Sequence, residues 1–365
     1  MSSLRAVIAT YDDAPPIGGQ GRYVCGLRAA LQRRGVDVCT VAGHGDCAIP
    51  VRRVTGRPPL DHSLALTRDP RPLLAADPDV VHVMGGPGGV IIPRRLEAPV
   101  VYTAHHTYRQ AYRRSSPRRL LSLVEARSYR LASVVLAVSP STADAVRRLG
   151  VAPERVEVLG PGIEVERFDR GEALRDPAVV LFVGRLEPEK RPLDAVAVMA
   201  RLAVESAPGR RVRGMVIGGG SLEPAVRAAA AAAPPGSVEV CGPVSEEDLL
   251  AAYATATVVV VPSRYEGLGL VALEAMAAGA AVVAYDVSGL RDAVTDRGRL
   301  VPSGDRESMA RACVALIRDA AGRSELVERA RESVIAAHSW DAVAARVEAV
   351  YRALGSPAQK RPVLG

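Results

Sequence analysis

Short apolar runs, rich in valine, isoleucine and leucine, recur along the chain and alternate with longer stretches of helical periodicity. Runs that are apolar throughout are typical of strands covered by helices on both faces of a parallel sheet. The alternation therefore predicts an α/β protein with doubly wound sheets. The predicted strands are Arg5–Thr10, Asp37–Val41, Val80–Met84, Val100–Thr103, Val134–Val138, Val156–Leu159, Val179–Val183, Val212–Ile217, Val238–Cys241, Thr257–Val261 and Ala281–Tyr285.

Helices are predicted between these strands wherever the apolar residues repeat every three to four positions. The stretch 44–78 is rich in proline and arginine and has weak periodicity, so we expect a surface loop there. Near the end of the chain, Trp340–Leu354 places its apolar residues on one helical face. The predicted helices are 20–34, 117–131, 141–149, 192–205, 222–233, 246–254, 270–278, 306–318 and 339–354.

The length of 365 residues favours two domains. Pro161–Pro177 contains few aliphatic residues and has a proline at each end, which is typical of an interdomain linker. We therefore expect two Rossmann-like domains and a C-terminal helix that packs back towards the first of them. The expected boundaries are 1–163 for the N-terminal domain, 164–177 for the linker, 178–338 for the C-terminal domain, 339–354 for the helix and 355–365 for the tail.

Composition narrows the cellular setting. No apolar run approaches 18 residues, so no transmembrane helix is expected, and the N-terminus lacks the layout of a signal peptide. The five cysteines are scattered and form no C-x-x-C pair, which argues against a disulfide framework or a zinc site. These observations predict a cytoplasmic protein.

The net charge of +7 is concentrated in the first half. Residues 94–130 alone contain nine arginines and two glutamates. Two interpretations stay open: an anionic partner, such as a phosphorylated acceptor or an acidic membrane surface at the inner face of the membrane, or a solvated arginine-rich surface. No base-reading module or aromatic interleaving is present, so we expect no nucleic acid partner.

Acidic and glycine residues gather after the apolar run that ends at Val261. Glu266 lies in a turn, Gly267 and Gly269 allow close approach of a ligand to backbone N–H groups, and Glu274 follows two helical turns later. A helix N-terminus beyond the carboxyl end of a strand favours a bound diphosphate, and carboxylates accept hydrogen bonds from hydroxyl groups. The alternative is a glutamate favoured by the helix dipole together with an unrelated helical glutamate.

A second cluster follows the run Val179–Val183, where Arg185 and Lys190 precede a helix. The chain contains only two lysines, Lys190 and Lys360, although it contains many arginines. A compact ammonium group near a phosphate is one reason to keep a lysine, and chance is the other.

Two features of the first half complete the candidate site. IGGQGRYV (17–24) places a glycine turn, including Gly19, between a strand and a helix, which indicates either a phosphate- or acceptor-binding loop or a simple βα turn. TAHHT (103–107) places His105 at the carboxyl end of a strand, where it is either a sugar-contacting histidine or an ordinary loop histidine. Asp77-Pro78-Asp79 imitates a D-x-D metal motif but directly precedes a strand, so we expect it to be structural.

Together these segments resemble the retaining glycosyltransferases of family 4, also called glycosyl transferases group 1, over nearly the whole chain. The carriers of the resemblance are IGGQGRYVCGLRAALQRRG, AHHT, GRLEPEK, VCGPVSEEDLL and the E-x7-E element in EGLGLVALE. The resemblance implies a GT-B fold, in which two doubly wound Rossmann-like domains face each other across a cleft. It also implies a nucleotide diphosphate sugar as co-substrate and no cofactor or metal.

The resemblance assigns roles by position. Arg185 and Lys190 resemble the pair that binds the donor diphosphate, Glu266 the acid that contacts the donor sugar, and Glu274 the acid that binds the ribose. His105 resembles the histidine near the reacting sugar. The remaining donor-binding positions are Gly19, Gly219, Val244, Gly267, Leu268, Gly269 and Leu270. The chain departs from the family pattern at His106, Pro161, Ala281, Ser288 and Asp292.

These implications predict a retaining glycosyltransferase that moves a hexosyl-type sugar to a hydroxyl of a lipid-linked or natural-product acceptor. Two alternatives stay open: a nucleotide-sugar epimerase on the same fold, and a non-catalytic subunit that binds a nucleotide sugar. Retention of Arg185, Lys190, Glu266 and Glu274 together argues against the second alternative.

Overall fold

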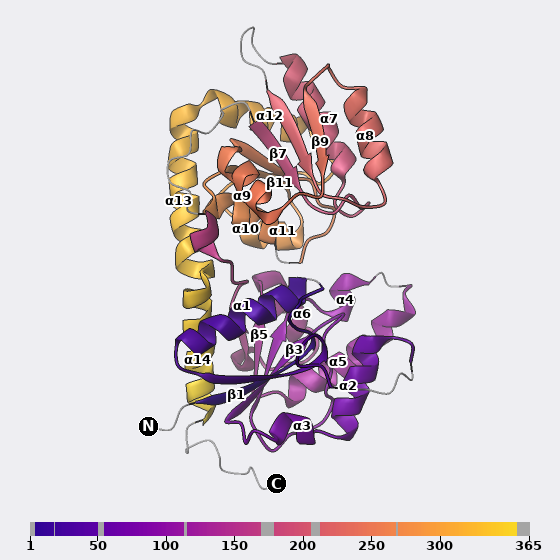
Figure 1. Ribbon diagram of the computed structural model, residues 1–365, viewed down its shortest axis with the longest axis vertical. Helices are drawn as coiled ribbons and strands as arrows, with labels where there is room; N and C mark the ends of the chain where they lie inside the picture. Colours follow the sequence, from indigo (N-terminus) through magenta and orange to yellow (C-terminus); the bar gives the residue numbers. More distant parts are fainter. Residues whose placement is uncertain are drawn as a thin grey trace. The chain divides into compact units, whose positions relative to one another are not determined.

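The computed structural model describes residues 4–17, 19–49, 55–112, 115–168, 179–205, 212–267 and 269–355. The chain forms two compact units (Figure 1). Unit 1 comprises Met1–Gly162 and Trp340–Gly365, and unit 2 comprises Ile163–Ser339. Of the predicted linker, residues 169–177 lie outside the described residues, as does the predicted tail from 356 onward.

Unit 1 is built on a parallel sheet of six strands in the order β2-β1-β3-β4-β5-β6. The strands are β1 Arg5–Asp12, β2 Asp37–His44, β3 Val80–Gly85, β4 Val100–Ala104, β5 Val134–Ala137 and β6 Val156–Val158. The helices are α1 Gly19–Arg33, α2 Pro58–Arg68, α3 Arg71–Leu74, α4 Tyr108–Ala111, α5 Leu121–Leu131, α6 Pro140–Arg147 and α14 Trp340–Gly355, with the 3-10 helices η1 Pro117–Leu120 and η2 Pro153–Arg155.

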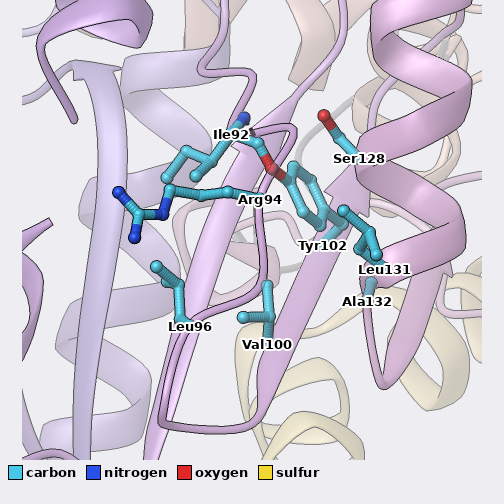
Figure 2. Close-up of a pocket in the computed structure, with 8 residues that line it drawn as sticks. All are labelled: Ile92, Arg94, Leu96, Val100, Tyr102, Ser128, Leu131 and Ala132. Atoms are coloured by element: carbon cyan, nitrogen blue, oxygen red, sulfur yellow. Dashed lines mark hydrogen bonds between the residues drawn. The ribbon is translucent and has the colours of Figure 1, made fainter. Parts of the chain in front are cut away.

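Both faces of this sheet are covered, as the unbroken apolar runs require. Helices α1 and α14 cover one face, and the apolar side of α14 includes Val343, Val347 and Tyr351. Helices α2, α3, α5 and α6 cover the other face. There Tyr102 of β4 packs beside Leu131 of α5 and the loop that carries Arg94 (Figure 2). Helix α14 is therefore part of the core of unit 1.

The stretch 44–78, predicted to be a surface loop, is helical over Pro58–Arg68 and Arg71–Leu74, and the prediction is wrong there. This stretch contains α2 and α3, which bury Leu66 and Leu73 completely. Helix α2 also buries three consecutive polar residues, Asp61, His62 and Ser63. Because polar residues occupy its buried side, α2 lacks the apolar stripe by which an amphipathic helix is found in a sequence.

Unit 2 repeats the architecture with a parallel sheet in the order β12-β11-β10-β7-β8-β9. The strands are β7 Val179–Val183, β8 Arg213–Ile217, β9 Val238–Gly242, β10 Val258–Val261, β11 Ala281–Tyr285 and β12 Arg299–Val301. The helices are η3 Val165–Phe168, α7 Pro192–Glu205, α8 Glu223–Ala231, α9 Glu246–Thr255, α10 Leu270–Ala277, α11 Ser288–Val294, α12 Arg306–Arg318 and α13 Ala320–His338. The predicted α/β fold with two doubly wound sheets is confirmed.

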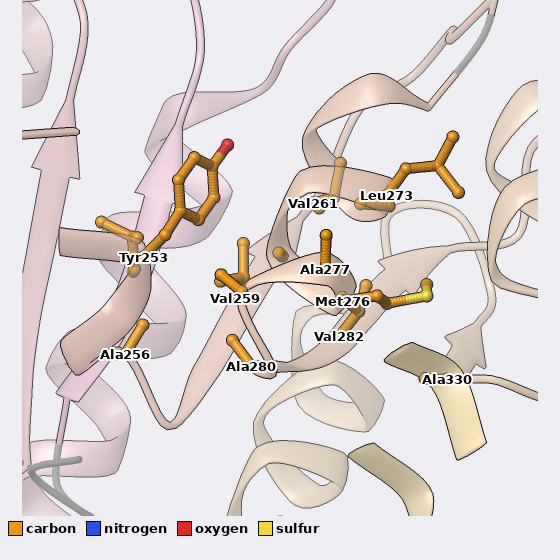
Figure 3. Close-up of a cluster of buried hydrophobic side chains, with 14 of the residues drawn as sticks. Tyr253, Ala256, Val259, Val261, Leu273, Met276, Ala277, Ala280, Val282 and Ala330 are labelled. Carbon is orange, nitrogen blue, oxygen red and sulfur yellow. The ribbon is translucent and has the colours of Figure 1, made fainter. Parts of the chain in front are cut away.

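Helix α10 packs against its sheet through a mainly small-residue face. Ala272, Ala275 and Ala277 are buried in the core cluster that includes residues of β10 and β11. Figure 3 shows Met276 beside Ala330 of α13. This packing fixes the start of α10 beyond the carboxyl end of β10.

Elements α11, β12 and α13 were not predicted. Helix α13 buries only Leu326, Ala330 and Val334, one residue in every turn. That stripe is narrower than the apolar face of a typical amphipathic helix. Strand β12 has only three residues. In the part of the chain that the structure describes, no helix combines the length and apolarity needed to cross a membrane.

Candidate active site

The strand order of unit 2 brings together loops that are distant in the sequence. Strand β7 lies between β8, the next strand in the chain, and β10, the third strand after β7. This is the switch point of a doubly wound sheet, where ligands bind beyond the carboxyl ends of the strands. The loop after β7 carries Arg185 and Lys190, and the loop after β10 carries Glu266.

Lys190 and Glu266 are in direct contact. The Nζ atom of Lys190 lies 2.5 Å from Oε2 of Glu266, and both side chains are largely buried. Ser263 donates a hydrogen bond to the same carboxylate oxygen at 3.2 Å. The backbone N–H of Arg264 donates to the carbonyl of Glu189 at 2.7 Å, which holds the two loops together. Two residues 76 positions apart thus form one charged pair at the switch point.

Arg185 lies in the same loop but makes a different contact. Its guanidinium donates to Glu189 at 2.8 Å, and its side chain is 70% exposed. The structure therefore places Arg185 in the same loop as Lys190, with an accessible cationic end. Because an exposed ion pair contributes little free energy, a stronger anion can replace Glu189 at low cost.

The turns after β7 and β8 pack backbone against backbone. The N–H of Leu186 donates to the carbonyl of Gly219 at 2.9 Å. A Cβ atom on Gly218 would lie 1.9 Å from the carbonyl oxygen of Gly184, so only glycine fits. A Cβ atom on Gly219 would lie 3.1 Å from the ring of Pro243, which directly precedes Val244. Gly219 and Val244 thus belong to neighbouring turns at the same sheet edge.

The start of α10 presents backbone donors. Gly269 has a φ of +65°, precedes the helix, and provides no side-chain cap. The first N–H groups of a helix, here from Leu270 onward, lack intrahelical acceptors and favour anions. Gly267 lies just ahead of this turn, and Leu268 lies outside the described residues.

Glu274 points to the α9 side of α10. Its Oε2 atom accepts a hydrogen bond from the buried hydroxyl of Tyr253 at 2.9 Å. Burial and the neighbouring carboxylate hold the pKa of Tyr253 well above its ordinary value, so the hydroxyl stays a donor. Glu266 lies before the helix and Glu274 within it, so the two acids are held by different elements.

In unit 1 the loop after β1 is organised by Asp12. Its Oδ1 atom accepts the N–H of Ile17 at 2.9 Å, and a Cβ atom on Gly21 would lie 2.4 Å from its Oδ2 atom. Gly19, the first residue of α1, is exposed and has open space around it. The glycine turn is thus anchored by its acid while Gly19 stays accessible.

His105 follows β4 and is 6% exposed. Burial lowers the pKa of its imidazole to about 3, so the ring is neutral at pH 7. Its Nε2 atom is buried and has no hydrogen-bond partner among the residues that the structure describes. Because an unpaired buried polar atom costs about 1–3 kcal/mol, this nitrogen favours a polar group supplied by a ligand.

Sequence reasoning missed several residues that hold these loops. Glu187 accepts two hydrogen bonds from Ser221, at 2.9 and 2.6 Å, which join the turns after β7 and β8 and lower the pKa of the Glu187 carboxyl. Glu125 of α5 accepts the N–H of Tyr108 at 3.1 Å, three residues after His105. Glu187 lies in a loop and Glu125 in a helix, and neither belongs to a local sequence motif. The sequence therefore offered no signal for the long-range partner of either acid.

Asp77 and Asp79 serve the sheet of unit 1. Asp77 has a φ of +46°, and Oδ2 of Asp79 accepts the N–H of Arg5 at 3.0 Å where β1 begins. Within the described ranges no cluster of three or more histidine, cysteine or acidic residues could hold a metal ion.

Known families match both halves of the chain. Residues 177–319 match the model described as glycosyl transferases group 1, and residues 17–167 match that of glycosyltransferase family 4. A D-inositol 3-phosphate glycosyltransferase of Streptosporangium roseum is 33% identical, over 75% of this chain and 69% of the relative. The protein of that name from Geodermatophilus obscurus is also 33% identical, over 92% of this chain and 85% of the relative.

Solved structures of glycosyltransferases share the fold. Sucrose-phosphate synthase from Thermosynechococcus elongatus has a TM-score of 0.72 at 24% identity, covering 97% of this chain and 99% of that chain. Anabaena HepE, crystallised with UDP-glucose, has a TM-score of 0.68 at 16% identity, covering 96% and 100%. The chain therefore belongs to the glycosyl transferases group 1, a family of glycosyltransferases with the GT-B fold.

Proposed function

We propose that this glycosyltransferase moves a hexosyl-type sugar from a nucleotide diphosphate sugar to an acceptor hydroxyl with retention of configuration. The contact between Lys190 and Glu266 carries the proposal, because it joins a phosphate-binding cation to a hydroxyl-binding acid at the switch point of unit 2. The complex of Anabaena HepE with UDP-glucose supports a donor of this class.

In this proposal the diphosphate takes the two remaining donors of Lys190 and the guanidinium of Arg185, displacing Glu189. The N–H groups at the start of α10 complete the anion site, and Gly19 approaches the phosphates. An ammonium group has three donors, and the Glu266 carboxylate occupies one of them. Glu266 binds hydroxyls of the sugar, and Glu274 binds the ribose beside Tyr253. The turns at Gly219 and Val244 contact the base.

Charge grows on the leaving diphosphate as the bond to the sugar breaks. Cations fixed before the reaction stabilise that charge, and loss of one such contact costs on the order of 3 kcal/mol. With no carboxylate assigned as a nucleophile, we propose that the acceptor hydroxyl attacks the face that the leaving group vacates. An oxygen of the departing phosphate takes the acceptor proton. The neutral His105 imidazole binds a hydroxyl of the reacting sugar through its unpaired Nε2 atom.

The donor is found by thermal-shift screening of nucleotide sugars. Binding at a concentration 100 times Kd stabilises the protein by about 2.7 kcal/mol. UDP-glucose is the first probe, and loss of its stabilisation in Glu274→Ala supports the ribose contact.

The anomeric configuration of the product, measured by NMR, tests the mechanism, and clean inversion would refute retention. Undiminished turnover in EDTA is expected, because cations and backbone donors bind the diphosphate.

The acceptor is proposed to be a phosphorylated or lipid-linked hydroxyl compound. The names of the two relatives support a phosphorylated cyclitol, and the basic segment 94–130 supports an anionic acceptor. Comparison of turnover with inositol 3-phosphate and with free inositol decides this. Equal rates with both compounds would contradict an acceptor phosphate.

Peripheral contact with an acidic membrane is proposed for the exposed face of η1 and α5. Leu120 and Leu123 there are 69% and 63% exposed, and Arg118 and Arg127 are exposed beside them. Arginines attract acidic headgroups and leucines enter the interface. The protein is expected to sediment with vesicles of acidic lipid but not with neutral ones. Leu120→Ser combined with Leu123→Ser should abolish this, whereas Val204→Ser, at a site 72% exposed in unit 2, should not.

A further inference from the structure

His105 is the end of a chain of buried aromatic rings in unit 1. The rings of His105 and Tyr23 meet edge to face, with centroids 4.9 Å apart and an interplanar angle of 86°. Tyr23 in turn packs against Trp340, with centroids 5.2 Å apart and an angle of 64°. None of the three side chains is more than 7% exposed. Helix α1 supplies Tyr23, and α14 supplies Trp340 as its first residue.

Two glycines hold the Trp340 ring in place. A Cβ atom on Gly26 would lie 2.2 Å from the indole, and one on Gly162 would lie 2.3 Å from it. Side chains at either position would therefore expel the ring. Gly162 is the last residue of unit 1 before the chain enters unit 2, and Trp340 is the first after it returns. The indole thus lies at the two points of unit 1 where the chain leaves for unit 2 and returns from it.

A second connection runs through hydrogen bonds. The Tyr351 hydroxyl of α14 lies 2.5 Å from Nδ1 of His82, and Nε2 of His82 lies 2.7 Å from the Thr103 hydroxyl. Thr103 belongs to β4 and is two residues before His105, which follows that strand. All three side chains are fully buried. Burial lowers the pKa of His82 to about 3, so the imidazole is neutral and donates from one nitrogen while it accepts at the other.

We propose that α14 is the positioning element of His105, acting on its ring through Trp340 and Tyr23 and on its strand through Tyr351 and His82. The inference rests on the proposed function, because it assigns a support to the histidine placed there against the sugar. A ring held edge to face against another buried ring cannot rotate freely, so the buried Nε2 atom keeps one direction. Misplacement of a reacting group by about 1 Å can cost a hundredfold in rate.

The test is Tyr23→Leu in the whole 365-residue chain. Leucine removes both ring contacts, so water reaches the imidazole and the pKa of His105, followed by NMR, rises from about 3 towards 6.5. The titratable groups that face this imidazole are Tyr23, His82 and His106. We expect kcat to fall tenfold to a hundredfold while the donor KM changes less than about twofold. Tyr23→Phe keeps both ring contacts and is expected to recover the low pKa.

The matched control is Tyr102→Leu, which removes an equally buried tyrosine of unit 1 that packs edge to face on Tyr129 at 5.3 Å. It should lower stability without altering the His105 pKa. Because Tyr23 and Trp340 act in series, Tyr23→Leu with Trp340→Leu should lower kcat no further than the poorer single variant. An unchanged His105 pKa in Tyr23→Leu, or an equal change in the control, overturns the proposal.

His105→Ala separates this inference from the proposed function. Full transferase activity in that variant would refute the role proposed for His105 in the reaction. The NMR titration of His105 in the Tyr23 and Trp340 variants would still decide whether α14 positions the ring, because that measurement needs no turnover.

Discussion

Lys190 is the single residue on which the proposed chemistry depends most directly, because its ammonium group touches Glu266 and has donors left for phosphate. Lys190→Ala is expected to lower kcat about a hundredfold, which corresponds to roughly 3 kcal/mol of lost transition-state stabilisation. Steady-state kinetics with the identified donor measure this. Arg201→Ala, which removes an exposed cation from the same unit, is the control and should leave kcat unchanged. An increase in KM alone, without loss of kcat, would contradict the role.

Glu125 controls the pH dependence of stability near the His105 loop. Burial raises the pKa of its carboxyl from 4.5 to about 7. Between pH 4.5 and pH 7 the Glu125 carboxyl is therefore protonated in the folded state and ionised in the unfolded state. The stabilisation that results is present below pH 4.5 and is lost as the pH rises through 7. Glu125→Gln should remove this loss, which amounts to about 3 kcal/mol at most. Urea unfolding at pH 5 and pH 8 tests it, with the exposed Glu97→Gln as control.

At the scale of elements, the turn into α10 decides whether its backbone donors can approach a ligand. Gly269→Ala introduces a side chain at positive φ and a Cβ atom 2.7 Å from that of Ala293. Gly236→Ala introduces the same backbone strain, at a φ of +70°, with nothing within 4 Å. We expect Gly269→Ala to cost about 1–3 kcal/mol more than the control, since α10 and α11 must move apart. Urea unfolding measures the cost, and the donor KM should rise only in Gly269→Ala.

At the scale of the whole molecule, buried neutral histidines make unit 1 sensitive to acid. Burial lowers the pKa of His62 to about 4 and those of His82 and His105 to about 3. Each neutral histidine stabilises the folded state at a pH above 6.5, the pKa of a histidine in the unfolded chain. This stabilisation is lost as the pH falls from 6.5 towards the lower pKa values of the folded state. Between pH 7 and 4.5, protonation of Glu125 stabilises the folded state and offsets the loss of stability from one of the three histidines. Unit 1 should therefore unfold before unit 2 on acidification.

The only tryptophan reports this transition. Trp340 belongs to unit 1 and is 7% exposed. Its emission should shift to longer wavelength at a pH where far-ultraviolet circular dichroism still shows the helices and strands of unit 2. Coincident transitions by the two probes would contradict separate unfolding. His82→Gln should move the fluorescence midpoint to lower pH, because it removes one of the protonating groups.

Much of this molecule follows from local pattern. Apolar runs and helical periods locate nearly all the strands and most helices, because burial on both faces of a sheet requires such runs. Glycine turns at strand ends make Gly19, Gly219 and Gly269 candidates for close approach of the backbone to a ligand. Helix α2 escapes this reasoning, since Asp61 and His62 occupy its buried side. Helix α13 escapes it through a stripe only one residue wide.

The amino-acid sequence by itself determined the α/β class, the candidate charges and the glycine turns, since each depends on neighbours a few positions away. Only the tertiary structure decided which distant residues meet. The order of the strands puts β10 beside β7 and so brings Glu266 to Lys190 across 76 positions. The return of the chain at Trp340 places α14 against α1 and, through Tyr23, beside His105. Such contacts depend on the order of the strands and the path of the chain, which local periodicity in the sequence does not predict.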